Sequence, residues 1–420
     1  MADLLALSSR VIDSGVVDEP VNRITNELSE LADGLAIVES FSHSVVLDAG
    51  EGLVAFDASH ARTGADVVAA IRGWTPTPVT HLVYTHGHAD HVGGSPDFAA
   101  AFDRMTVVGH RNVEERFERY AYTNDWNVRI NARQFGGVRG DFGMGATPEF
   151  IPPTTLRPDR VVDDHDIVSV GDTTIELHHA RGETDDHLWG WIPDHKWLFT
   201  GDFVIWNFPN AGNPQKVQRF PIEWAAALRA MAERGPELLL PAHGLPVEGR
   251  DRITLVLTDI ADALERLVAE VVEMMNAGEV LDTIVHSVHV PDDVLAKPFL
   301  RPLYDEPEFV VRNIWRQFGG WWDGAPSRLK PAPDAALAAE VADLAGGATV
   351  LIDRALQLCE IGDFRLACHL ADLAGWAAPS DAGVHASRAL IYRSRRAAET
   401  SLMAKGIFAG AARDSEAVAG

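Results

Sequence analysis

The sequence is poor in cysteine and has no long apolar run. Its two cysteines, Cys359 and Cys368, are nine residues apart, which is not the spacing of three or four that places side chains on one helix face. No local disulfide or paired metal ligand is therefore predicted, and both thiols are expected to pack as small apolar side chains. A transmembrane helix needs a run of about 18 apolar residues. The chain has none, so no membrane span is predicted.

Basic residues are also scarce. The chain has 36 lysines and arginines against 61 aspartates and glutamates, which gives a net charge of −25. Such an acidic surface repels a phosphate backbone, and no Lys/Arg cluster interrupts it, so nucleic acid is not an expected partner. The N-terminus lacks a basic stretch followed by a long apolar stretch, so no signal peptide is predicted and the chain is expected in the cytoplasm.

What the chain does have, up to about residue 250, is an alternation of strand-like and helix-like segments. Apolar runs that flank short turns indicate hairpins, and apolar residues at helical spacing indicate helices. The predicted elements are hairpins at residues 44–57, 167–178 and 188–200, strands at 80–85 and 236–240, and helices at 63–74 and 222–234. This pattern indicates an α/β fold in which helices cover packed sheets.

Two regions depart from that rhythm. Residues 111–160 are rich in Asn, Arg, Gly and Pro and are predicted to form a long loop, either an active-site wall or a structural insertion. Beyond residue 250 the pattern becomes all-helical, with a long helix at 255–277 and later helices at 349–360, 364–377 and 384–398. A helical region of this kind packs on its own domain or on a partner subunit.

Four potential metal ligands occur within six residues of the segment THGHADH at 85–91. They directly follow the strand predicted at 80–85, so a strand-to-helix loop would point them into one pocket. Imidazole nitrogen and carboxylate oxygen are ligands with which proteins hold zinc while leaving room for water. An ordinary polar turn is the alternative, but three histidines and an aspartate so close together make it a poor one. The segment therefore predicts a metal site.

This HxHxDH motif resembles the signature of the metallo-β-lactamase superfamily, and the similarity extends from about residue 40 to 250. The family places further ligands after particular strands. Competent residues stand at each of these positions here: Glu183 in Gly-Glu-Thr, Asp202 in Thr-Gly-Asp and His243 in Pro-Ala-His-Gly. The resemblance implies the αβ/βα sandwich of that superfamily and a centre of two metal ions.

The resemblance also implies how the ligands are shared. Each metal would take three residues and one carboxylate would bridge: His86, His88 and Glu183 for the first, Asp90, His91 and His243 for the second, and Asp202 between them. Asp90 and Asp202 are the predicted catalytic carboxylates, because two cations lower the pKa of a bridging water to give hydroxide. Zinc is the predicted metal. Iron and manganese stay open, since three carboxylates make a harder site.

Asp57 ends a predicted strand before the motif. It matches a family aspartate that orients a ligand histidine, a role that a carboxylate commonly plays behind a metal-bound imidazole. A polar strand end without such a role is the alternative reading of this residue.

Glutamate at position 183 resembles the alkyl sulfatase branch of the superfamily. Residues 298–333, which contain Arg-Asn and then Gly-Trp-Trp-Asp-Gly, are similar to a segment of those enzymes, and the helical tail is similar to their dimerisation domain. The resemblance implies a homodimer whose parts are an N-terminal segment at 1–35, a catalytic domain at 36–250 and a dimerisation domain at 251–420. Enzymes of that branch usually carry a further C-terminal lipid-binding-like domain, which this chain is expected to lack because the sequence stops before it. Asp202 departs from the branch, which has a second glutamate there.

A small alkyl sulfate is the best single substrate class that this resemblance implies. The segment at 206–219 replaces the branch's sulfate-gripping run but remains rich in donors. Its candidate contacts to a small, anionic substrate are Asn207, Asn213, Lys216 and Arg219, although a solvated Pro/Asn loop would look the same. Other functions stay open: hydrolysis of a lactone, carboxylic ester or phosphoester, metal-dependent dehalogenase or redox chemistry, and a non-catalytic dimeric binding module.

Overall fold

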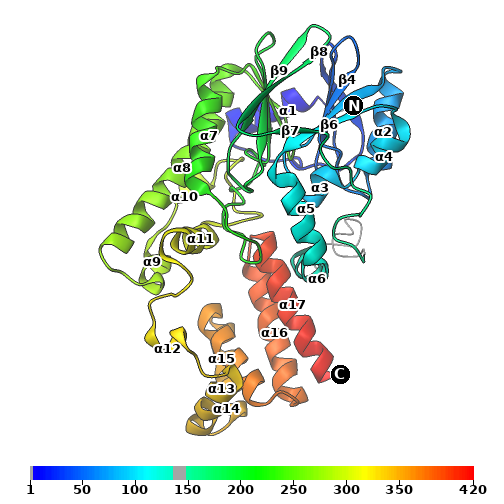
Figure 1. The fold of residues 1–420 in the computed structure, drawn as a ribbon. Coiled ribbons are helices and arrows are strands. Elements are labelled where there is room, and N and C mark those ends of the chain that lie inside the picture. The colour runs from blue at the N-terminus through cyan, green and yellow to red at the C-terminus, as the bar shows by residue number, and fades with distance from the viewer. Residues whose placement is uncertain (1–2, 136–147) are drawn as a thin grey trace. The chain divides into compact units, whose positions relative to one another are not determined.

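The computed structural model describes residues 3–135 and 148–420. Two sheets packed face to face form the core of the part that precedes residue 250 (Figure 1). The first sheet has the order β1 (Leu28–Ala32), β2 (Leu35–Val38), β3 (Ser44–Asp48), β4 (Leu53–Phe56), β5 (Val79–Val83), β6 (Thr106–His110) and β7 (Arg160–Val162). The second has the order β13 (Val247–Glu248), β12 (Leu238–Pro241), β11 (Trp197–Gly201), β10 (Leu188–Ile192), β9 (Thr173–His179) and β8 (His165–Val170). The predicted αβ/βα sandwich is confirmed.

Helices precede and follow the strands of the second sheet, and some of them cover the outer faces of the two sheets (Figure 1). Those that precede the second sheet are α1 (Leu4–Ser14), α2 (Gly64–Trp74), α3 (Ala89–Val92), α4 (Ser95–Ala101), α5 (Asn112–Tyr122) and α6 (Asn124–Phe135). Those that follow β11 are α7 (Pro221–Glu233), α8 (Arg250–Asn276), α9 (Leu281–Ser287), α10 (Asp292–Leu295) and α11 (Pro307–Gly319).

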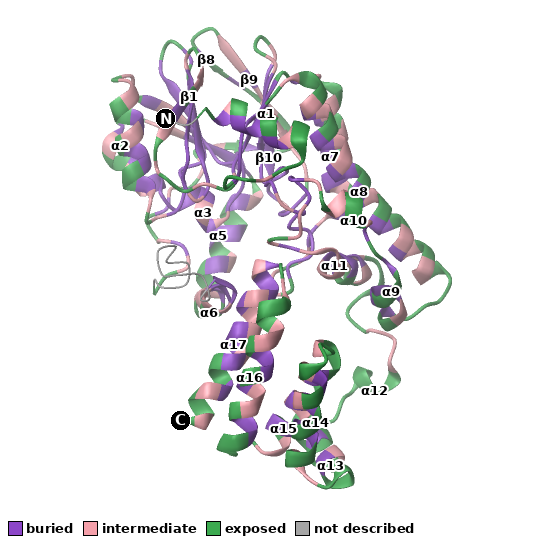
Figure 2. Cartoon of the chain, turned by 180° about the vertical axis from the view of Figure 1, so that it is seen from behind, coloured by how far each residue is buried: buried purple, intermediate pink, exposed green. Residues whose placement is uncertain are grey.

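Strand β4 shows why the layers form. Its four residues are all buried, and they alternate in direction because successive side chains of a strand point to opposite faces. Val54 and Phe56 enter the core between the sheets, while Leu53 and Ala55 enter the core under α2 and α4. The Phe56 ring stacks on Phe199 of β11 with ring centroids 4.0 Å apart, which joins the two sheets. In Figure 2 the central strands are accordingly buried.

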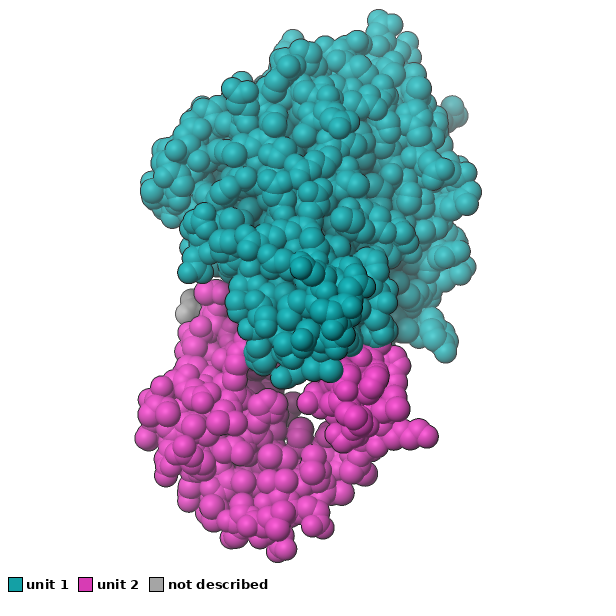
Figure 3. All heavy atoms as spheres, turned by 90° about the vertical axis from the view of Figure 1, so that its left-hand side faces the viewer, with its two compact units in different colours: residues 1–127, 147–320 teal, residues 128–146, 321–420 magenta. Residues whose placement is uncertain are grey.

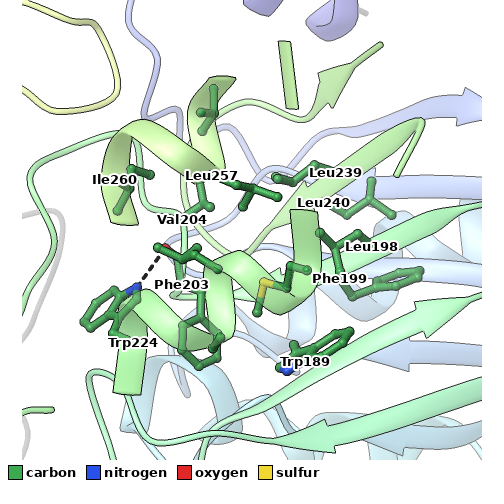
Figure 4. Close-up of a cluster of buried hydrophobic side chains, with 14 of the residues drawn as sticks. Trp189, Leu198, Phe199, Phe203, Val204, Trp224, Leu239, Leu240, Leu257 and Ile260 are labelled. Atoms are coloured by element: carbon green, nitrogen blue, oxygen red, sulfur yellow. Dashed lines mark hydrogen bonds between the residues drawn. The ribbon is translucent and has the colours of Figure 1, made fainter. Parts of the chain in front are cut away.

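The second sheet is sealed on its far side by α7 and α8 (Figure 4). Trp224 of α7 is fully buried and its indole N–H donates to the carbonyl of Phe203, 3.1 Å away, so the large ring brings no unpaired donor into the core. Leu257 and Ile260 of α8 belong to the same cluster. This packing fixes the segment that follows β11, which carries one of the candidate ligands.

The three predicted hairpins are confirmed as β3–β4, β8–β9 and β10–β11, all antiparallel. The expectation for residues 1–35 was incomplete, because α1 and β1 lie there and β1 extends the first sheet.

The loop predicted at residues 111–160 is wrong for residues 112–135, which form α5 and α6; residues 136–147 lie outside the described ranges. Helix α5 buries Val113, Arg116, Phe117 and Tyr120, a helical spacing in which an arginine holds a core position.

The chain folds into two compact units, which Figure 3 shows in different colours. The first comprises residues 1–127 and 147–320, and the second comprises 128–146 and 321–420. This division lies at residue 320 rather than 250, so α8 to α11 pack with the sheets. The predicted boundary at 250 between domains of different function stays a prediction.

The second unit is all-helical. It contains α12 (Pro326–Leu329), α13 (Asp334–Ala345), α14 (Ala348–Glu360), α15 (Phe364–Ala377), α16 (Ala382–Ala398) and α17 (Leu402–Ala419), which confirms the helices predicted here. Asp363 and Asp381 cap α15 and α16 by accepting backbone N–H groups. Within the described residues, no single helix is long and apolar enough to cross a membrane; only α13 and α14 together, bent by 87°, pass on length and composition.

Candidate metal centre

Each candidate ligand lies in a segment that follows a strand, and two of them, Asp90 and His91, lie in the short helix α3. The motif His86–His91 follows β5, Glu183 follows β9, Asp202 follows β11 and His243 follows β12. Because β11 and β12 run parallel, the loops that follow them emerge at the same edge of their sheet. Gly201 makes room at this edge: its φ is +52°, and a Cβ there would lie 2.5 Å from Nε2 of His187.

A first cluster is formed by His86, His88 and Asp202, whose potential ligand atoms all lie within 4.8 Å of one another. Nε2 of His86 lies 2.8 Å from Nδ1 of His88 and 3.9 Å from Oδ2 of Asp202. Glu183 approaches the same place, with Oε1 3.6 Å from Nδ1 of His88. The structure thus brings all predicted ligands of the first metal together.

A second cluster is formed by Asp90, His91 and His243. Oδ2 of Asp90 lies 3.6 Å from Nε2 of His91 and 3.5 Å from Nε2 of His243. Oδ1 of Asp202 is 3.4 Å from the same atom of His91 and 3.5 Å from that of His243. Asp202 therefore turns one oxygen to each cluster, which is the placement that a bridging carboxylate requires.

Asp57 lies behind the second cluster. Its Oδ2 is 2.7 Å from Nδ1 of His91, and both the backbone N–H and the hydroxyl of Thr85 donate to its carboxylate at 2.7 Å. The hydroxyl of Ser42 also lies 3.0 Å from the same nitrogen of His91. These contacts place the Nδ1 proton of His91 toward Asp57 and leave Nε2 as the atom that faces the cluster.

The donor set fits a cation. Nε2 of His91 and Oδ1 of Asp202 are buried and have no hydrogen-bond partner among the described residues, although such orphaned buried atoms are costly. Burial disfavours a charged His91, yet the carboxylates of Asp202, Asp57 and Asp90 outweigh it and hold its pKa well above the usual value. Burial, aided by neighbouring positive charges, holds the pKa of His86 well below it. The site thus combines neutral imidazole with excess negative charge.

Glu183 is held from outside the clusters. Its Oε1 lies 2.9 Å from a guanidinium nitrogen of Arg219, and the side-chain amide of Asn210 donates to the same oxygen. Burial raises the pKa of Glu183 to about 8, and the charge of Arg219 opposes that shift.

The other predicted substrate contacts lie in the same segment. Asn207 donates to the carbonyl of Ile205, and Oδ1 of Asn213 accepts from the backbone N–H of Gln215 at 3.0 Å. The ammonium of Lys216 lies 5.3 Å from the ring centroid of Phe150. Burial and the charge of Arg219 lower the pKa of Lys216 to about 7, while Asp90 and Glu183 act in the opposite direction. Their contacts to substrate stay predictions.

Sequence reasoning missed the support beneath the motif. Asp186 is fully buried and accepts hydrogen bonds from the backbone N–H of Gly87, at 2.9 Å, and from Nε of Arg116, at 2.8 Å. It therefore fixes the backbone between His86 and His88. The signal was present as an arginine at a helical core position in α5, which requires a buried carboxylate as its partner.

Two further buried histidines back the clusters. The ring of His187 lies 4.6 Å from that of His86, and its Nε2 accepts from the backbone N–H of Asp202 at 3.2 Å. His43 bonds through Nε2 to the carbonyl of Gly244 at 2.8 Å, beside His243. Burial lowers the pKa of His187 to about 3 and that of His43 to about 4. Both rings are therefore neutral.

Comparison with known proteins finds two family matches in this chain. The family model for the metallo-beta-lactamase superfamily matches residues 37–243, and the model for alkyl sulfatase dimerisation matches residues 280–417. A linear primary-alkylsulfatase from a Pseudomonas species is 26% identical over 374 residues, which cover 84% of this chain and 69% of that protein. An (R)-specific secondary-alkylsulfatase, also from Pseudomonas, is 23% identical over 83% of this chain and 56% of its own length.

The fold has a solved counterpart in the stereoselective inverting sec-alkylsulfatase Pisa1 from Pseudomonas sp., with a TM-score of 0.83 and 21% identity. That likeness covers 93% of this chain and 66% of the solved chain, so the chain spans about two thirds of it. The two family matches together cover most of the sequence. The chain thus has a metallo-beta-lactamase superfamily domain and an alkyl sulfatase dimerisation domain, which supports an enzyme of the alkyl sulfatase-like type.

Proposed function

We propose that this chain hydrolyses an alkyl sulfate at a centre of two divalent cations. One observation carries the proposal: Asp202 presents one oxygen to the histidines of the first cluster and the other to those of the second. A carboxylate in that position would hold a cation in each cluster with a different oxygen. The alkylsulfatase names of the two Pseudomonas relatives support the choice of substrate class.

The proposed ligands are those implied by the sequence: His86, His88 and Glu183 for one cation, Asp90, His91 and His243 for the other, and Asp202 shared. Zinc is the proposed metal because imidazole predominates, and the three carboxylates keep iron and manganese as alternatives. Two such cations, when bound, polarise an ester oxygen and supply hydroxide near neutral pH by lowering the pKa of water.

The protein's own part is orientation and charge. Asp57 holds the His91 ring with Nε2 toward the cluster, and Asp186 holds the motif backbone at Gly87. Lys216 interacts with the charges of Asp90 and Glu183, and its protonated form would favour a substrate with an anionic group over a neutral ester. Asn207 and Asn213 are proposed to line the same side; Asn213 accepts from the N–H of Gln215, the residue before Lys216.

The test is to quantify metals in the purified protein and to assay sulfate release from a short and a long alkyl sulfate in the same sample. We expect two metals per chain and sulfate release that Asp90→Ala abolishes. Two metals without sulfate release would discard the sulfatase proposal and favour a lactone, carboxylic ester or phosphoester. A protein that takes up no metal would revive a non-catalytic binding module.

We also propose that the second unit makes a homodimer. Its match to the alkyl sulfatase dimerisation family supports this, as do large apolar side chains in solvent, with Leu344 86% and Ile361 76% exposed. Sedimentation at micromolar concentration should give twice the mass of one chain. A monomer at that concentration would contradict the proposal.

A further inference from the structure

Arg219 differs from the other candidate substrate contacts because its guanidinium already forms an ion pair with Glu183. The side chain is buried, and its guanidinium lies 2.9 Å from Oε1 of Glu183 while the same nitrogen donates to the Glu183 carbonyl. Asn210, on the same segment, donates to that carboxylate oxygen as well. Arg219 and Asn210, from one loop, thus both bind the carboxylate of Glu183, a predicted metal ligand.

The backbone of Arg219 is gripped in turn by Asn313, a buried residue of α11. The side-chain amide of Asn313 donates to the Arg219 carbonyl at 3.0 Å, and its oxygen faces the Arg219 N–H at 3.4 Å. The side chain of Gln218 donates to the carbonyl of Asn313 at 3.2 Å. These reciprocal contacts tie the end of the loop to the helix.

The start of the loop is anchored to the residues just before α11. The buried carboxylate of Asp305 accepts from the backbone N–H of Gly212 at 2.7 Å, and the N–H of Phe208 donates to the carbonyl of Arg301 at 2.9 Å. A Cβ on Gly212 would lie 2.2 Å from the backbone nitrogen of Val310, so the two segments touch through their backbones. All of these residues lie within the first compact unit.

We propose that Arg219 is a positioning residue for Glu183 and that Asn313 positions Arg219. Glutamate has more rotatable bonds than the histidines and aspartates of the two clusters, so it loses more side-chain freedom when it binds. Fixing its carboxylate by Arg219 and Asn210 removes that freedom before a cation arrives, as outer hydrogen bonds to ligating carboxylates do elsewhere. The proposal rests on the proposed function, in which Glu183 is a ligand.

A useful variant must separate geometry from charge. Removing the guanidinium would also remove a positive charge beside the cation, and that change by itself favours metal binding. Arg219→Lys keeps the charge but loses the planar fork that grips Glu183. Asn313→Ala keeps both charges and removes only the support of the Arg219 backbone. Both variants therefore change orientation without changing the net charge of the site.

The experiment strips the full-length protein of metal and titrates it with zinc against a coloured chelator. For the wild type we expect two equivalents. In Arg219→Lys and in Asn313→Ala one equivalent should bind about 10–100-fold more weakly, the range seen when an outer partner of a ligand is lost. Arg312→Ala is the matched control on the same helix, since Arg312 is exposed and its guanidinium pairs with Glu308 at 3.3 Å. It should bind zinc as the wild type does.

Wild-type zinc affinity in both variants would overturn the proposal, and a raised KM for an alkyl sulfate in Arg219→Lys would then identify Arg219 as a substrate contact. If Asn313→Ala does not fold, Arg219→Lys alone decides, because it leaves the backbone contacts of the loop in place. If the wild type binds no zinc at all, the proposed function fails first and this proposal fails with it, an outcome distinct from an effect confined to the variants.

Discussion

The two clusters are built from similar residues but are supported in opposite ways. In the second cluster the support acts on an imidazole: Asp57 holds Nδ1 of His91 at 2.7 Å, and Ser42 lies 3.0 Å from the same atom. In the first cluster the support acts on a carboxylate, since Arg219 and Asn210 hold Glu183. Thr85 lies between them, 3.1 Å from Nδ1 of His86 and bonded to Asp57.

This difference follows from where the ligands lie in the chain. His91 lies in the short helix α3, and Asp57, the residue directly after β4, contacts its ring at 2.7 Å. Glu183 lies in a loop after β9, and the segment at 206–219 contacts its carboxylate. The His91 ring of the second cluster is thus held by residues next to strands of the first sheet, whereas Glu183 of the first cluster is held by a segment outside both sheets. The predictions below test that contrast.

The largest effect is expected where the clusters meet, at Asp202→Ala. Because each oxygen of this carboxylate faces a different cluster, its loss should weaken the binding of both metals and reduce hydrolysis to the rate without enzyme. Metal content by elemental analysis and product release would be measured together. Asp194→Ala, in the exposed turn between β10 and β11, is the matched control. Loss of only one metal would mean that Asp202 serves one cluster and does not bridge.

Asp57→Asn should affect the second cluster selectively. Asparagine suits the backbone here, because Asp57 has a φ of 61° and asparagine tolerates the left-handed region. If its oxygen keeps the bond from Thr85 N–H, its NH2 group faces Nδ1 of His91, and that nitrogen can no longer donate. The proton then moves to Nε2, the atom that faces the cluster, so one metal should bind about 10–100-fold more weakly.

Zinc titration of the Asp57→Asn variant is the measurement, and Asp172→Asn in the exposed β8–β9 turn is its control. Unchanged affinity for both equivalents would show that Asp57 is only a polar strand end. An equal loss at both equivalents would contradict the division of support between the clusters.

Much of this site could be predicted because it lies close to strand ends. The motif at 85–91, Asp202 and His243 each follow a short apolar strand that the sequence shows clearly, and the parallel order of strands brings such loops to one edge. Asp57, Asp202 and His243 were identified through the resemblance to the metallo-β-lactamase superfamily, which places such residues after these strands. The hairpins were predictable because short turns separate their apolar runs.

The residues that sequence reasoning missed act across long separations. Asn313 is 94 residues from Arg219, and Asp186 is 70 residues from Arg116, so no local pattern joins either pair. Helix α5 was predicted as loop because residues 111–160 are rich in Asn, Arg, Gly and Pro, and Arg116, at one of the buried positions of the helix, belongs to that set. Burial of this arginine is favourable because Asp186 pairs with it, and that pair forms only when the chain folds.

The pH dependence of stability tests whether His43, a buried histidine beside His243, is neutral in the folded protein. His43 has a pKa of about 4 when folded, because burial disfavours its charge, and a usual value of 6.5 when unfolded. Between these values only the unfolded chain takes up the proton, so the contribution of His43 is present above pH 6.5 and is lost as the pH falls toward 4. From pH 7 to 5 the loss should be about 2 kcal/mol.

The measurement is urea unfolding of metal-free wild type and of His43→Gln, which can still donate to the Gly244 carbonyl. Glutamine does not titrate, so the stability deficit of the variant should shrink by that amount between pH 7 and 5. A deficit that is the same at both pH values would mean that His43 is not held neutral.

The smallest effect is expected from Ser42→Ala. The Ser42 hydroxyl shares Nδ1 of His91 with Asp57, and the carboxylate is both closer and charged, so it already fixes the tautomer. Loss of one neutral hydrogen bond is worth about 1 kcal/mol, so zinc affinity at one equivalent should fall only about fivefold. Ser42→Ala and Asp57→Asn should also combine less than additively, because they act on one nitrogen. A Ser42 effect as large as that of Asp57 would place the main support of the second cluster in the hydroxyls rather than in the carboxylate.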